Sequence, residues 1–207
     1  MMTAVPAKKG FWGTIWEYLR TTDHKKIAHL YFIAGGFFFI LGGIEALLIR
    51  IQLIKPENTF LDAQTFNEMF TMHGTTMIFL AATPLLFAFM NAVMPLQIGA
   101  RDVAFPFLNA LGFWLFFFGG VFLNLSWLFG QVPDAGWTSY ASLSMDSSGH
   151  GIDFYLIGLQ IAGFGTLMSG INFIATIVTM RAPGMSFMRM PMFTWCTFVA
   201  SGLILFA

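Results

Sequence analysis

The stretch that decides the fold is MFTMHGTTMIFLAATPLLFAFMNAVMPLQIGA (residues 69–100), followed by Arg101-Asp102 and then by VAFPFLNALGFWLFFFGGVFLNLSWLFGQVP (residues 103–133). Neither apolar stretch contains an Asp, Glu, Lys or Arg. About 20 helical residues cross a hydrocarbon core about 30 Å thick, so each stretch is long enough to span a membrane. Arg101 and Asp102 therefore mark a tight connection between two spans, and the carboxylate at this mouth is a candidate port for protons.

The composition places the whole chain in the same class. Apolar residues make up 57% of the sequence and charged residues only 10%, which a water-soluble surface does not allow. We predict an all-α integral membrane protein with four complete transmembrane helices and a truncated fifth. The predicted spans are Ala28–Gln52, Met69–Leu96, Phe107–Gly130, Ile152–Met180 and Pro191–Ala207. We expect residues 1–207 to form a single membrane domain, as a fragment that is part of a larger helical bundle.

The basic residues predict the orientation, because Lys and Arg accumulate on cytoplasmic flanks. Two of them, Arg50 and Lys55, lie on one side of the predicted spans. Eight lie on the other side, namely Lys8, Lys9, Arg20, Lys25, Lys26, Arg101, Arg181 and Arg189. We therefore predict a multi-pass protein whose N-terminus is cytoplasmic and whose Asp102 faces the cytoplasm.

The N-terminal segment and the overall charge indicate the partners. Lys8 and Lys9, with Trp12 and Trp16, are typical of an interfacial anchor on an anionic lipid membrane. The net charge is zero and there is no basic cluster, so nothing in the sequence predicts binding to nucleic acid.

His73 is the candidate metal ligand, about one turn inside the outer end of the second span. An intramembrane histidine is also often a hydrogen-bonded packing residue, so both interpretations stay open. Gly74 leaves room beside it for a flat macrocycle, and Arg50 approaches a similar depth, where the peripheral oxygens of a haem would accept its hydrogen bonds. A second axial ligand would have to come from another helix, which we expect beyond Ala207.

The other titratable residues in or near the spans receive less specific predictions. We expect His24, His29 and His150 to be solvated or to lie at the membrane interface. Glu45 lies in the first span toward its outer end, and we expect it either to reach the interface or to pair with Arg50.

Three asparagines form a second group of candidate functional residues. Asn91, Asn109 and Asn172 fall toward the cytoplasmic side of three spans, with Asp102 below them. Amide groups can hold a file of waters without the cost of a buried charge, so this set predicts a proton pathway that opens at Asp102. The alternative is that the asparagines serve as interhelical hydrogen-bond donors and acceptors, as is common in membrane helices. Their spacing does not decide between the two.

Together, these segments resemble the N-terminal part of subunit I of the haem–copper oxidases, of the cytochrome c oxidase type found in bacterial membranes. The resemblance covers essentially all of the chain and rests on six blocks in order. They are Asp23-His24-Lys25-Lys26-Ile27, Leu48-Ile49-Arg50, His73-Gly74-Thr75-Thr76-Met77-Ile78-Phe79, Pro95-Leu96-Gln97-Ile98-Gly99-Ala100-Arg101-Asp102-Val103-Ala104-Phe105-Pro106, Gly136-Trp137-Thr138-Ser139-Tyr140 and Ile171-Asn172-Phe173.

The resemblance implies a role for each candidate residue. His73 would be an axial ligand of the low-spin haem iron, and Arg50 would hydrogen-bond the edge of that haem, expected to be haem a. Asp102 would open the proton pathway. That pathway would continue past Asn91, Asn109 and Asn172, with Tyr31 nearby.

The resemblance also implies the reaction and the partners. The full-length subunit would take electrons from cytochrome c, reduce oxygen to water and pump protons in the bacterial cytoplasmic membrane, together with subunits II and III. The high-spin haem and the copper would come from the remainder of the subunit, so the fragment alone would be inactive. A quinol oxidase subunit I of the same family and a non-redox membrane transporter fragment are the alternatives. The stretch Leu48-Ile49-Arg50-Ile51-Gln52 is more similar to the cytochrome c branch than to the quinol branch.

Overall fold

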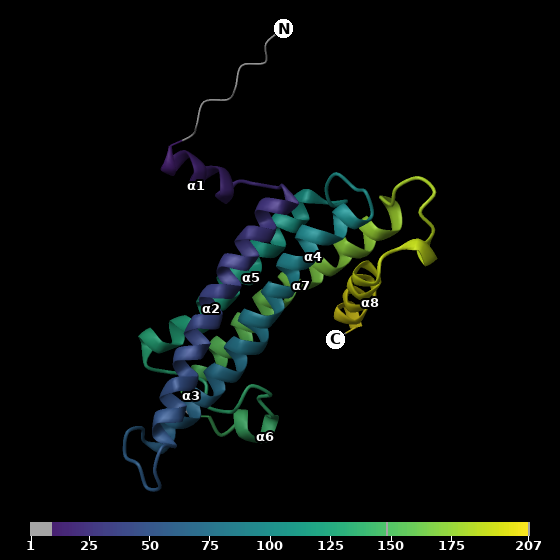
Figure 1. Ribbon diagram of the computed structural model, residues 1–207. Coiled ribbons are helices and arrows are strands. Elements are labelled where there is room, and N and C mark those ends of the chain that lie inside the picture. The colour runs from purple at the N-terminus through teal and green to yellow at the C-terminus, as the bar shows by residue number, and fades with distance from the viewer. Residues whose placement is uncertain (1–9, 148, 207) are drawn as a thin grey trace.

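The computed structural model describes residues 10–147 and 149–206, and most of this part of the chain is helical (Figure 1). The short α1 (Phe11–Leu19) precedes the long α2 (His24–Gln52). The next span is continuous but changes its winding from α3 (Ala63–Thr75) through the π-helical turns of η1 (Thr76–Ala82) to α4 (Thr83–Gln97). The remaining elements are α5 (Pro106–Phe129), α6 (Ala141–Ser144), α7 (Gly151–Thr179), the 3₁₀ turn η2 (Phe187–Arg189) and α8 (Met192–Phe206).

Four of these helical segments have the length and apolarity needed to cross a membrane. They contain 29, 35, 24 and 29 residues, and α8 is a shorter apolar helix. The predicted all-α membrane architecture is therefore confirmed, with boundaries shifted by a few residues. The first span begins at His24 because the Asp23 carboxylate accepts a hydrogen bond from the Lys25 amide at 2.9 Å and so caps the helix. Lys8, Lys9 and Ala207 lie outside the described residues.

The long helices lie side by side in an elongated bundle (Figure 1). One end of the bundle carries α1 and the connection between α4 and α5, and we call it the α1 end; the opposite end carries α6. Large aromatic side chains fill the middle, where the Tyr31, Phe38, Phe116 and Phe173 side chains are almost completely buried. The ring centroids of Tyr31 and Phe116 are 5.7 Å apart, within the usual range for packed aromatic pairs.

Glycines let α5 and α7 pack closely against each other. A Cβ atom placed on Gly119 would lie 2.6 Å from the carbonyl oxygen of Gly158, and one placed on Gly165 would lie 2.4 Å from the carbonyl oxygen of Gly112. These distances are far below van der Waals contact, so the interface depends on the absence of side chains. Small residues at helix contacts are a common feature of membrane bundles.

We expect Gly119→Ala to destabilise the folded protein by about 1–3 kcal/mol, because the added methyl group must push α5 and α7 apart. The measurement is the midpoint of thermal unfolding of the purified full-length protein in detergent. Gly163→Ala on α7 is the matched control, since a Cβ atom there meets nothing within 4 Å. Equal midpoints for the two variants would contradict the close packing.

Candidate functional site

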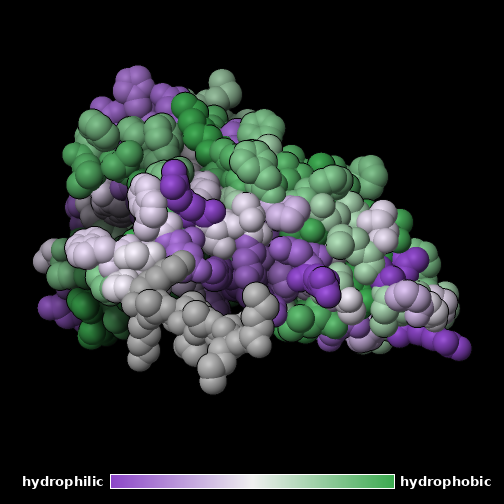
Figure 2. Space-filling model, turned by 90° about the horizontal axis from the view of Figure 1, so that it is seen from above, coloured by the Kyte–Doolittle hydropathy of each residue, from purple (hydrophilic) through white to green (hydrophobic). Residues whose placement is uncertain are grey.

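Hydrophilic residues gather at the α1 end of the bundle, with apolar side chains beside them (Figure 2). Asp102 lies here, partly exposed, in the connection between α4 and α5. Its Oδ1 atom accepts a hydrogen bond from the amide of Val103 at 2.8 Å. The carboxylate is therefore held at the surface by the backbone that follows it, and it remains accessible to solvent.

Two of the three predicted asparagines contact each other directly. The side chains of Asn91 on α4 and Asn109 on α5 are both fully buried, and Asn109 Nδ2 donates to Asn91 Oδ1 at 2.7 Å. Asn91 Nδ2 donates in turn to the carbonyl oxygen of Phe87 at 2.9 Å. Asn109 Oδ1 is buried and has no hydrogen-bond partner among the described residues. The pair therefore joins two helices and keeps one acceptor oxygen free.

Asn172 on α7 does not join this pair through its side chain. It binds the backbone of Phe105, accepting from the amide at 2.8 Å and donating to the carbonyl oxygen at 3.2 Å. One turn later, the Thr176 hydroxyl accepts from the amide of Ala104 at 2.8 Å. These bonds hold the connection that carries Asp102 against α7. For Asn172, the contacts are those of the interhelical hydrogen-bond alternative.

His24 is the residue that the sequence analysis placed wrongly. We expected a solvated side chain, but its exposed fraction is 1%, and its Nδ1 atom lies 2.7 Å from the carbonyl oxygen of Asn91. The prediction failed because the burial of a residue at the start of α2 depends on α4 lying over it. His29 and His150 are exposed, as predicted.

Tyr31 lies deeper in the bundle on the same helix. It is seven residues beyond His24, about 10 Å along the axis of α2. Its hydroxyl group lies 3.3 Å from Ser169 Oγ on α7, and its ring packs against the rings of Phe87, Phe113 and Phe116. This hydrogen bond connects Tyr31, in the aromatic middle of the bundle, to α7.

His73 lies toward the other end of the bundle, in the last turn of α3. Its Nδ1 atom is 2.9 Å from the carbonyl oxygen of Gly42 on α2. A carbonyl oxygen only accepts, so Nδ1 carries the hydrogen. When the ring is neutral, Nε2 then keeps its lone pair, which is the arrangement of a histidine that binds a metal. The π-helical turns of η1 follow within three residues, and such turns are frequent at functional sites.

Gly74 does not have the role that we expected for it. A Cβ atom at this position would lie 3.1 Å from Cβ and Cδ1 of Trp137, so the space beside it is already filled. The loop that carries Trp137 is held in place by Tyr155, whose hydroxyl donates to the Trp137 carbonyl, and by Thr71, whose hydroxyl accepts from the Gly136 amide at 2.9 Å. The glycine allows this loop to pack on α3 and does not make room for a macrocycle.

Glu45 and Arg50 do not pair. Glu45 has an exposed fraction of 4%, and neither carboxylate oxygen has a hydrogen-bond partner among the described residues. Arg50 is exposed at the end of α2. Both expectations for Glu45, the interface and the ion pair, are therefore wrong. The reason is geometric, because five residues along an α-helix turn the side chain by roughly 140° to a different face.

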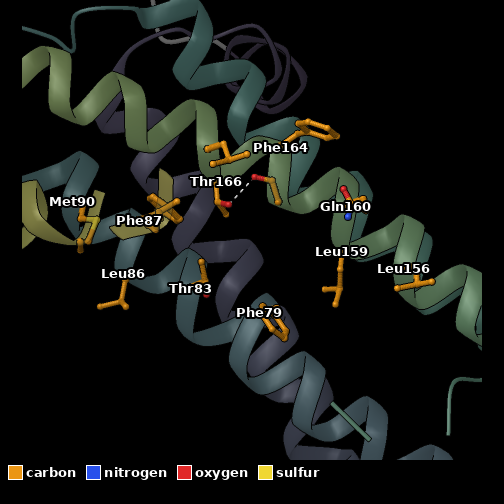
Figure 3. A pocket seen from close by; sticks show the side chains of 14 residues that line it. Phe79, Thr83, Leu86, Phe87, Met90, Leu156, Leu159, Gln160, Phe164 and Thr166 are labelled. Carbon is orange, nitrogen blue, oxygen red and sulfur yellow. Dashed lines mark hydrogen bonds between the residues drawn. The ribbon is translucent and has the colours of Figure 1, made fainter. Parts of the chain in front are cut away.

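An apolar cavity in the described part of the chain lies away from all these residues. It is a groove of about 600 Å³ between the second span, α7 and α8 (Figure 3). Its walls are mainly apolar, with Thr83, Gln160 and Thr166 as polar exceptions. The side chains that were predicted to carry chemistry therefore lie at the two ends of the bundle and not in this groove.

Comparison with known proteins gives a consistent family. Residues 26–207 match the family described as "Cytochrome C and Quinol oxidase polypeptide I". The whole chain is 72% identical to cytochrome c oxidase subunit 1 of Bacillus subtilis and 73% identical to that of Bacillus sp. (strain PS3), covering 33% and 34% of those proteins. Over 199 residues, 95% of the chain, it is 52% identical to quinol oxidase subunit 1 of Bacillus spizizenii, covering 31% of it. The chain thus spans about a third of the length of these relatives.

We expect Asn172→Leu to loosen the connection that carries Asp102, because the backbone of Phe105 loses two hydrogen bonds. A loss of about 1 kcal/mol makes amide exchange at Phe105 roughly fivefold faster. Hydrogen–deuterium exchange of the full-length protein measures this change. Thr179→Val is the control, because that exposed hydroxyl bonds only to its own helix. Unchanged exchange at Phe105 in the Asn172 variant would show that these hydrogen bonds do not hold the connection.

Proposed function

Because the chain belongs to the cytochrome c and quinol oxidase polypeptide I family, we propose that it is part of the catalytic subunit of a respiratory oxidase that reduces oxygen to water with electrons from cytochrome c and pumps protons. The observation that carries the choice of donor is the identity of 72–73% to cytochrome c oxidase subunits, against 52% to a quinol oxidase subunit. The proposal includes subunits II and III as partners. Activity with reduced cytochrome c and with a quinol, compared in the purified enzyme, tests the choice of donor.

In this proposal, His73 and Arg50 hold a low-spin haem, haem a. The hydrogen bond between His73 Nδ1 and the Gly42 carbonyl supports the assignment, because it leaves Nε2 free to bind iron. Arg50 is exposed, and no hydrogen bond or ion pair occupies its guanidinium group among the described residues, so it can donate to peripheral oxygens of the macrocycle. The bound haem supplies one-electron redox chemistry. In this proposal, a further iron ligand, the high-spin haem and the copper would be held by other parts of the full-length subunit.

At the α1 end, Asp102 collects protons for a pathway that passes Asn91, Asn109 and Asn172. Its partial exposure supports this role, because an ionisable group at the surface can exchange protons with water. The free acceptor of Asn109 supports it as well, since Oδ1 can accept a hydrogen bond from a water molecule. Asn172 contributes by holding the backbone next to Asp102. The bias of eight basic residues against two supports a cytoplasmic N-terminus in the bacterial membrane and a cytoplasmic Asp102.

We expect His73→Ala in the full-length enzyme to abolish the low-spin haem signal, because the iron loses one of its two strong-field ligands. The measurement is a reduced-minus-oxidised visible spectrum. Arg50→Met is the comparison variant, and it should keep the haem but shift its absorption band and potential, since only a peripheral contact changes. An unchanged low-spin spectrum in His73→Ala would refute the assignment, and a transporter without haem would show no such spectrum at all.

We expect Asp102→Asn to slow proton uptake by at least about tenfold, because the amide keeps the shape of the carboxylate but cannot ionise. Folding, haem content and reduction of the low-spin haem should be retained. Oxygen consumption and proton release by enzyme reconstituted in vesicles measure the effect. The matched control is Asp146→Asn, because Asp146 is an exposed carboxylate near α6, at the opposite end of the bundle. Turnover and pumping equal to those of the control would make Asp102 an ordinary solvated charge.

A further inference from the structure

A proline creates an unusual acceptor at the centre of the polar cluster. In an α-helix, the carbonyl oxygen of each residue accepts from the amide four positions later. The residue four positions after Asn91 is Pro95, which lies within α4 and has no N–H group. The carbonyl oxygen of Asn91 therefore receives no such bond from its own helix, although Asn91 is fully buried. A buried carbonyl needs another donor.

His24 on α2 provides this donor. Its Nδ1 atom lies 2.7 Å from the carbonyl oxygen of Asn91, and the ring is 1% exposed. Because the carbonyl oxygen can only accept, Nδ1 must carry a hydrogen. The imidazole is thus fixed at the start of α2, where the Asp23 cap sets the first turn of the helix.

Asn91, whose backbone carbonyl contacts His24, is also held through its side chain by α5. Asn91 Oδ1 accepts from Asn109 Nδ2 at 2.7 Å, and Asn91 Nδ2 donates to the Phe87 carbonyl at 2.9 Å. Asn91 therefore has its backbone fixed by α2 and its side chain fixed by α5. Loss of the His24 contact would free the backbone and let the Asn91 amide turn away from Asn109.

We propose that His24 is a positioning residue of the proton pathway: it donates to the carbonyl that Pro95 leaves free and so holds Asn91 in contact with Asn109. This inference rests on the proposed function, because it assumes that protons pass this pair. Two buried atoms without hydrogen-bond partners support this inference. His24 Nε2 and Asn109 Oδ1 are both buried without a hydrogen-bond partner among the described residues, and in a neutral ring with its hydrogen on Nδ1 both atoms are acceptors. The contact thus also keeps two acceptor atoms available to water in the same cluster.

The test compares variants of the full-length, assembled oxidase in vesicles. His24→Ala removes the donor, and proton uptake should slow by roughly three- to tenfold, the value of one hydrogen bond. His24→Asn places an amide N–H near the position of Nδ1 and should restore most of the rate. His29→Ala, an exposed histidine one turn plus a residue later, is the matched control and should behave as wild type.

The same His24 substitution in a protein that also carries Pro95→Ala separates this role from a general effect on folding. Pro95→Ala supplies an amide to the Asn91 carbonyl from within α4, so His24→Ala should then slow proton uptake much less than it does with Pro95 present. An equal slowing in both backgrounds would overturn the proposal, as would His24→Asn behaving like His24→Ala. Haem spectra of all variants report that the enzyme has assembled.

An infrared measurement distinguishes failure of this inference from failure of the proposed function. With a ¹³C-labelled backbone carbonyl in asparagine, the band of Asn91 should shift on His24→Ala, because a hydrogen bond is lost. If Asp102→Asn slows proton uptake but His24→Ala does not, the positioning role is wrong. If Asp102→Asn leaves uptake unchanged, the proposed function fails, and an unshifted band in His24→Ala then overturns the contact as well.

Discussion

The helices of this chain are arranged by the need to satisfy buried backbone and amide groups where no water is available. In the hydrocarbon region, an unpaired carbonyl or amide costs several kcal/mol. Helices meet this need within themselves, except where the chain departs from regular winding. At such places a neighbouring helix supplies the partner, as His24 does for Asn91 and Asn172 does for Phe105. These two contacts between segments therefore lie at irregular points of the backbone.

The middle of the bundle has the opposite character, and this separates the two candidate sites. Aromatic rings around Tyr31 and Phe116 fill the space between α2, α4 and α5, while glycines bring α5 and α7 into backbone contact. The aromatic middle is close-packed, and Asp102 and His73 lie on opposite sides of it (Figure 1). The proposed haem ligand His73 lies toward the α6 end and the proposed proton port Asp102 at the α1 end. The packing thus keeps the proposed electron-transfer site apart from the site of proton uptake.

Several features could be predicted from the sequence because they depend on the order of residues alone. The length and apolarity of the spans are such features, and the all-α membrane architecture followed from them. The environments of His24, Glu45 and Gly74 could not be predicted, since each depends on which side chain of another segment lies opposite. His24 is buried because α4 covers it, and the space beside Gly74 is filled by Trp137 from a distant loop. These contacts depend on how segments far apart in the sequence pack against each other.

His24 and His73 make the same kind of hydrogen bond, although we propose different roles for them. In both, Nδ1 donates to a carbonyl oxygen of the neighbouring helix, which fixes the ring and leaves Nε2 as an acceptor. His73 is only partly buried, so its Nε2 can reach a ligand that other parts of the protein help to enclose. His24 is enclosed by the chain itself, so its Nε2 serves the interior of the polar cluster. The exposure of the ring, and not its hydrogen bond, therefore separates a candidate metal ligand from a positioning residue.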